Sequence, residues 1–201
     1  MEWWKWILEQ PKSSNPCFTE NPTADIQPFN SKNVWFLAGA FNSEYVDMPE
    51  RASYRKIDIP AGKSILLPVL NAFGVERHTY NLFKIEGLDD RVRHEMNIIN
   101  GPAMYVTVDG DIDHPIPDLE KYRVETKGVF PVTIPGKDNV TQLRHLFCKP
   151  IDCIAKGDGY WLFLHPFEES EIGKQHTIHS FGTCRSGAIR IEVNYKLNII
   201  E

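Results

Sequence analysis

The sequence predicts a mainly β protein: a single β-sandwich of the immunoglobulin-like or jelly-roll type, with a short N-terminal tryptophan-rich helix and one internal amphipathic helix. Three observations support this fold class. Short apolar or alternating segments follow one another from residue 34 to residue 200, turn-forming residues separate them, and little of the chain has helical spacing. No internal repeat or shift in composition divides the chain, so residues 1–201 are expected to form one domain.

The length and the net charge of the chain limit the classes of function that we expect. The chain has 201 residues, enough to bury a sizeable core without metals or disulfides. A net charge of −5 argues against a general binder of nucleic acids. No apolar stretch is long enough to span a membrane, and the N-terminus lacks a secretory signal peptide. We therefore expect a cytoplasmic protein, or an extracellular or periplasmic one from which a signal peptide has been removed.

The first helix is expected over Glu2–Gln10, where apolar residues follow helical spacing and a proline ends the pattern. Trp3, Trp4 and Trp6 could lie in a membrane surface, form a stacking platform for sugar rings or pack onto the core. A membrane-surface helix would carry more Lys and Arg on its polar face. We expect the indoles to pin the helix to the sandwich, with the rest of residues 1–33 packed along the domain.

The other elements follow from the hydrophobic pattern. Strands are expected at residues 34–41, 54–59, 64–70, 103–108, 121–126, 129–134, 160–165, 176–181 and 188–200. In the last strand one face is expected to hold Ile189, Ile191, Val193, Tyr195 and Leu197. The internal helix is expected near residues 88–99, where Leu88, Val92 and Met96 recur at steps of four.

Neither a metal nor another cofactor is expected. Asp109, Asp111 and Asp113 alternate as in a calcium-binding EF-hand loop. However, His114 stands where that loop requires glycine, and no helix flanks the segment. A solvated hairpin tip accounts for the three acids without calcium.

The four cysteines leave the redox compartment open. Cys148 and Cys153 are separated by KPID, a spacing that is typical of neither a redox motif nor a zinc site. They could form a local disulfide or be buried thiols. The states of Cys17 and Cys184 are likewise not determined by the sequence.

The chain lacks the signatures of common catalytic sites, including a nucleophile elbow, a phosphate loop and a dinucleotide-binding fingerprint. We therefore favour a non-enzymatic function. One alternative is a small hydrolase or lyase with acid and base groups at the sandwich rim, drawn from Asp158, Tyr160, His165, His176 and His179. The two last histidines are three residues apart on one strand and should face opposite ways. A secreted toxin or effector is the second alternative.

Polar residues in or beside apolar strands mark a candidate binding site, because burying them unpaired is costly. These residues are Lys63, Asn71, Arg123, Asp158, Tyr160, Trp161 and His165. In a structural interpretation, Lys63 or Arg123 neutralises Asp158, while Asn71 bonds loop backbone. In a functional interpretation, the residues line one pocket with Trp161 and an N-terminal tryptophan as its apolar wall. We expect a binding or interaction module for an unknown sugar, small molecule or protein.

Several segments, taken in order, resemble an uncharacterised family of bacterial and archaeal proteins, most of them exported. The segments are WWKWILEQPKSSNP, VWFLAG, IPAGKSILLPVLN, VDG, YRV, DGYWLFL and HTIHSFG. The resemblance covers nearly the whole chain and implies a β-sandwich with an immunoglobulin-like terminal hairpin, and export, but no activity. The chain differs from the family in lacking a signal peptide and in having Asp58 where many relatives have a cysteine. Both differences count against an exported, disulfide-stapled form.

Overall fold

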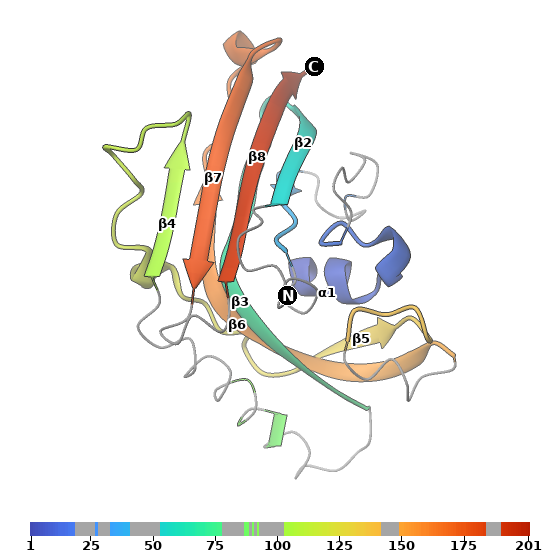
Figure 1. Ribbon diagram of the computed structural model, residues 1–201. Coiled ribbons are helices and arrows are strands. Elements are labelled where there is room, and N and C mark those ends of the chain that lie inside the picture. Colours follow the sequence, from blue (N-terminus) through green and yellow to red (C-terminus); the bar gives the residue numbers. More distant parts are fainter. Residues whose placement is uncertain are drawn as a thin grey trace.

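Two four-stranded β-sheets form most of the protein in the computed structural model (Figure 1). The structure describes residues 1–18, 27, 33–40, 53–77, 87, 88, 90, 92, 103–141, 149–183 and 190–201. Strands make up 50% of it, and among these residues α1 (Glu2–Leu8) is the one helix of seven residues or more. The prediction of a mainly β fold with a short N-terminal helix is therefore confirmed, although the helix ends earlier than expected.

The first sheet is built around two long strands. It contains, in spatial order, β1 (Val34–Phe36), β3 (Ser64–Arg77), β6 (Ile151–Leu164) and β5 (Phe130–Ile134). β3 and β6 are each 14 residues long, far beyond the strands that the sequence predicts there, and they pair antiparallel from Ile65 with Leu164 to Arg77 with Cys153. Figure 1 shows this pair curving from behind the second sheet to the region beneath α1, where β5 joins it.

The second sheet contains, in spatial order, β2 (Ser53–Pro60), β8 (Arg190–Ile200), β7 (Gln175–Thr183) and β4 (Ala103–Val108). The predicted alternation in the last strand is confirmed for Val193, Tyr195 and Leu197, which are all buried, while Ile191 is partly buried and Ile189 lies outside the described residues. β2 pairs with β8 in parallel, as β1 does with β3, so each sheet is mixed. The immunoglobulin-like or jelly-roll type stays a prediction.

The main hydrophobic core joins the two sheets. Leu67 and Leu162 from the first sheet pack in one cluster with Ile59, Ile178 and Tyr195 from the second. Burying a side chain of this size stabilises the fold by roughly 1.5–3 kcal/mol. This shared core fixes one half of the β3–β6 pair, while the other half extends beyond it.

The N-terminal tryptophans form a second core over the extended half of the first sheet. Trp3, Trp4 and Trp6 are only 5%, 3% and 6% exposed, and they pack with residues of β3, β5 and β6. The Trp3 indole also donates a hydrogen bond to the carbonyl of Leu37 over 2.8 Å. The expectation that the indoles pin the helix to the domain is confirmed. Buried rings leave no exposed stacking platform.

The next part of the N-terminal segment is bonded to the domain as well. The 3-10 helix η1 (Lys12–Ser14) is followed by a stretch whose carbonyls accept hydrogen bonds from Arg55, a buried residue of β2. Most of residues 19–32 lie outside the described residues. Residues 11–18 therefore pack along the domain, as predicted for the whole of residues 1–33.

Two other predicted elements differ or are only partly described. Residues 121–126 do not form a regular strand, because the 3-10 helix η4 (Leu119–Tyr122) is followed by a short extended segment. In the predicted helix near residues 88–99, Leu88 and Val92 are helical and pack against Ile154, and most of the rest lies outside the described residues.

The described residues also bear on the state of the cysteines and on membrane-spanning segments. Cys17 and Cys153 are both buried, while Cys148 and Cys184 lie outside the described part of the chain. In the part that the structure covers, no helix combines the length and hydropathy that a membrane crossing requires.

Candidate functional site on strand β6

Two charged residues lie in the middle of β6, among alanine, glycine and aromatic residues. Lys156 and Asp158 are 4% and 1% exposed, although such residues are rarely buried without a partner. Successive side chains of a strand point to opposite faces, so both share a face with Tyr160. Because Tyr160 belongs to the main core, the two charges lie where that core ends.

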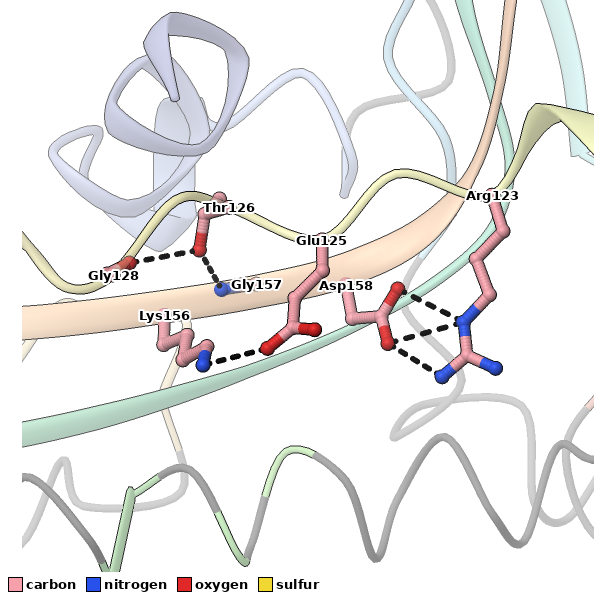
Figure 2. Close-up of polar contacts among 7 residues, drawn as sticks. All are labelled: Arg123, Glu125, Thr126, Gly128, Lys156, Gly157 and Asp158. Carbon is pink, nitrogen blue, oxygen red and sulfur yellow. Dashed lines mark hydrogen bonds and ion pairs between the residues drawn. The ribbon is translucent and has the colours of Figure 1, made fainter.

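An extended segment, residues 123–126, runs beside this part of β6. The backbone N–H of Val124 donates to the carbonyl of Gly159 over 2.8 Å, and that of Thr126 donates to the carbonyl of Gly157 over 2.9 Å. The Thr126 hydroxyl also accepts a hydrogen bond from the Gly157 N–H (Figure 2). These bonds hold the segment against β6 much as a strand would be held, and they fix the side chains that it carries.

The segment supplies a partner for each buried charge. Nη2 of Arg123 lies 2.6 Å from Oδ2 of Asp158, and its Nε lies 3.2 Å from each carboxylate oxygen. Nζ of Lys156 lies 2.6 Å from Oε1 of Glu125. Figure 2 shows these four side chains on one side of the β6 ribbon. We call Arg123, Glu125, Lys156 and Asp158 the charged row.

Within the charged row, the two residues of β6 are more deeply buried than their partners in residues 123–126. The side chains from β6 are 2% exposed for Asp158 and 5% for Lys156, whereas their partners are 39% exposed for Arg123 and 43% for Glu125. Each buried charge is therefore neutralised by a group that still reaches solvent.

Electrostatics favour the charged form of Arg123. The hydrogen bond to Asp158 raises the pKa of the Arg123 guanidinium. Burial raises the pKa of Tyr160, and the neighbouring Arg123 acts in the opposite direction. Removing the exposed member of such a pair would leave the buried charge away from water, which is strongly destabilising.

The opposite face of β6 is closely packed. A Cβ on Gly157 would lie 2.6 Å from Cε2 of Trp4, and a Cβ on Gly159 would lie 2.5 Å from Cγ of Asn71. Both positions therefore need glycine for close approach. The Oδ1 atom of Asn71 is buried and has no hydrogen-bond partner within the described residues, so this oxygen does not make the predicted bond to loop backbone there.

The structure brings only some of the predicted binding residues together. Arg123 is paired with Asp158 and forms a backbone bridge to Tyr160, so one of the two predicted ways of neutralising this carboxylate is observed. Trp161, in contrast, packs on the far face of β6, with its ring 5.0 Å from that of Trp3. Because the strand separates them, Trp161 and an N-terminal tryptophan cannot wall a pocket around Asp158.

The remaining predicted residues lie elsewhere. Lys63 is in the turn between β2 and β3, at the end of the first sheet where Ile65 pairs with Leu164. His165 follows β6 at that same end and is exposed. Neither belongs to the charged row, which lies near the middle of the strand.

Sequence reasoning missed Lys156 and Glu125. The predicted strand began at Tyr160, because IAKGDG is rich in residues that disfavour strands. One signal was present: Lys156, Asp158 and Tyr160 alternate, as they must if all three belong to one face of a strand.

The histidines of the catalytic alternative contact other carboxylates. His176 lies between Asp109 and Glu171, and Nε2 of His179 lies 3.0 Å from Oε1 of Glu192. Among the described contacts, no hydrogen bond joins any two of the five residues proposed as acid and base groups. The charged row likewise contains no nucleophile beside a base.

The acidic turn after β4 has partners of its own. Asp109 accepts a hydrogen bond from the backbone N–H of Thr177, and Asp111 lies within hydrogen-bond distance of the His114 ring. In the ranges that the structure covers, no group of three or more His, Cys, Asp or Glu side chains could hold a metal ion. A calcium site is not proposed here.

Comparisons of the chain with protein-family models, with curated proteins and with solved structures found no match. The resemblance to a family of exported proteins thus stays a prediction, and the case for function rests on the geometry of the site.

Proposed function

We propose that the protein is a binding module whose ligand is held by Arg123 of the charged row. One observation carries this proposal. Nε and Nη2 of Arg123 are bonded to the buried Asp158, and Tyr160 is a further hydrogen-bond partner of the guanidinium, but the group has five N–H donors and the side chain is 39% exposed. The guanidinium is held in place and still has donors to offer.

The ion pair with Asp158 favours ligand binding because it orders the Arg123 side chain in advance. A free arginine side chain has about 2 kcal/mol of rotamer entropy, part of which is lost when it is fixed on a ligand. Asp158 restricts Arg123 before any ligand arrives, so less of that cost remains at the binding step. A buried carboxylate is well suited to this task because it cannot move away.

The chemistry of the guanidinium indicates the kind of group that is bound. Its planar donors suit an oxygen acceptor, in the first place a carboxylate or a phosphate and then a sugar hydroxyl. A small molecule, a sugar or a protein side chain could supply that group. An immunoglobulin-like sandwich and export, which the family resemblance implies, are compatible with a module of this kind and are part of the proposal.

Side-chain NMR of arginine tests the proposal directly. The Nε–Hε signal of Arg123 is assigned by comparison with Arg123→Lys and then followed during titration with inorganic phosphate, citrate and a panel of neutral oligosaccharides. We expect at least one probe to shift this signal. Its dissociation constant should rise about tenfold or more in Arg123→Lys, which corresponds to about 1.4 kcal/mol.

Arg190→Lys is the matched control, because Arg190 makes an ion pair of the same length, 2.6 Å, with Glu192 on the second sheet. It should bind the probe as the wild type does. Equal weakening in both variants would show a general charge effect and contradict the proposal. So would a panel in which no probe shifts the Arg123 signal.

A further inference from the structure

A second cluster of titratable groups lies at the end of the second sheet, away from the charged row. Nδ1 of His176, near the start of β7, lies 2.8 Å from Oδ2 of Asp109, in the turn after β4. Its Nε2 lies 3.1 Å from Oε2 of Glu171, in the 3-10 helix η6 (Glu169–Glu171). Figure 1 shows the end of β4, the start of β7 and η6 at the same end of the sheet.

The imidazole is confined on one face as well as at its edges. The Phe167 ring is stacked on it, with the two ring centres 4.1 Å apart and an angle of 18° between the planes. The His176 side chain is only 14% exposed. The ring therefore has little freedom to turn away from either carboxylate.

A neutral imidazole cannot donate a hydrogen bond to both carboxylates. A carboxylate can only accept hydrogen bonds, and a neutral imidazole can donate from just one of its nitrogens. With the second nitrogen unprotonated, its lone pair would face a carboxylate oxygen. Only the imidazolium ion can donate to both Asp109 and Glu171 at once.

The other groups around the ring are consistent with a bound proton. Lys174 lies 2.9 Å from the other oxygen of Glu171, and chiefly this hydrogen bond, helped by His176, lowers the pKa of that carboxyl. From β8 the register partner of His176 is the apolar Leu197. In the turn between β2 and β3, Gly62 donates a hydrogen bond to the Phe167 carbonyl, and the charged residue of this turn is Lys63.

We propose that Asp109, His176 and Glu171 form a pH-sensitive latch across the end of the sandwich. With His176 protonated, the latch ties the β4 turn and η6 to β7. As the pH rises and the ring loses its second proton, one of the two bonds is lost and η6 loosens. The latch therefore holds both carboxylates only while both ring nitrogens carry a proton.

The test uses the full chain with His176→Gln, which fills similar space but cannot carry the charge. Hydrogen exchange of residues 167–176, corrected for intrinsic rates, is measured at pH 5.5 and pH 8 together with the melting temperature. In the wild type we expect faster exchange of this segment at pH 8 than at pH 5.5. The advantage of the wild type over the variant should fall by about 2–4 °C over the same range.

His114→Gln is the control, because His114 also lies 3.0 Å from a carboxylate, that of Asp111, but is 81% exposed and contacts no second carboxylate among the described residues. It should retain the pH response of the wild type. The proposal is overturned if His176→Gln keeps the same response, or if exchange of residues 167–176 does not depend on pH in the wild type.

Discussion

On one face of β6, Gly157 lies beneath the Trp4 indole, whereas on the other face Lys156 and Asp158 are buried beside their ion-pair partners. Residues that are neighbours in the sequence thus lie on opposite faces of the strand. On the tryptophan face, close contact of carbon surfaces leaves no room for another atom. On the charged face, the contacts are bonds between charges, and one partner of each pair reaches solvent.

This difference indicates which face is free to act. A face that is filled by a rigid indole can stabilise the fold but cannot receive a ligand. The charged face keeps donors and acceptors within reach of solvent, and its stability comes from pairing rather than from shape. We expect substitutions on the two faces to lower the free energy of unfolding by different amounts, with the largest loss on the tryptophan face.

Gly157→Ala should give the greatest loss. The new Cβ would meet Trp4, whose ring is held between Phe73 and Trp161 and cannot turn aside. We expect the free energy of unfolding to fall by about 3 kcal/mol or more, measured by urea denaturation. Gly87→Ala is the control, since a Cβ there meets nothing within 4 Å. Similar losses in both variants would show that the tryptophan face is not tightly packed.

Arg123→Gln should have the next largest effect. The substitution leaves the Asp158 carboxylate, 2% exposed, without its cation. Breaking a fully buried pair costs about 3–5 kcal/mol, and because Arg123 is partly exposed we expect about 2–3 kcal/mol in urea denaturation. A loss no greater than that of Arg190→Gln, whose pair lies on the second sheet, would show that burial of Asp158 does not matter.

Asp158→Asn should cost less than Arg123→Gln, although both break the same pair. Here the charge that remains is the guanidinium, which is 39% exposed and can be hydrated. We expect a loss of about 1 kcal/mol, or about 2–4 °C in melting temperature. The double variant should lose less than the sum of the two single losses. The reverse order of the single losses would contradict the burial that the structure shows.

The sequence predicted the fold better than the site, and the reason lies in what each depends on. Alternation over β8 and helical spacing in α1 are local signals, and both elements formed as expected. The row on β6 depends on a pairing between residues 123–126 and 156–159, which are distant in sequence. The prediction that Lys63 or Arg123 neutralises Asp158 is correct for Arg123, which the extended segment brings beside the carboxylate.

The failures have physical causes too. IAKGDG is a poor strand by propensity, but it is held between β3 and residues 123–126, and tertiary pairing overrides propensity. Trp161 was assigned to the site as the apolar wall of a pocket around Asp158. Because side chains alternate along β6, Trp161 lies on the other face from Asp158. This placement could be predicted only once the full length of the strand was known.

The smallest expected effect concerns how dry the tryptophan face is. Cys17 belongs to the same core cluster as Trp4, and burial raises the pKa of its thiol to about 12. In the unfolded chain a cysteine has a pKa of about 8.5, so above that pH the unfolded state loses a proton that the folded state keeps. Stability should therefore fall as the pH rises from about 8 towards 12.

Comparison with Cys17→Ala isolates this contribution, because Tyr195, whose pKa burial also raises, is present in both proteins. Between pH 8 and about pH 9.3 the wild type should lose about 1 kcal/mol more than the variant in urea denaturation. In the folded protein, the peptide that contains Cys17 should also resist alkylation at pH 8. If the two pH profiles were parallel, or the folded protein were labelled at Cys17, water would reach the thiol. The contrast between a dry face and a charged face of β6 would then be weaker than the packing of Trp4 on Gly157 indicates.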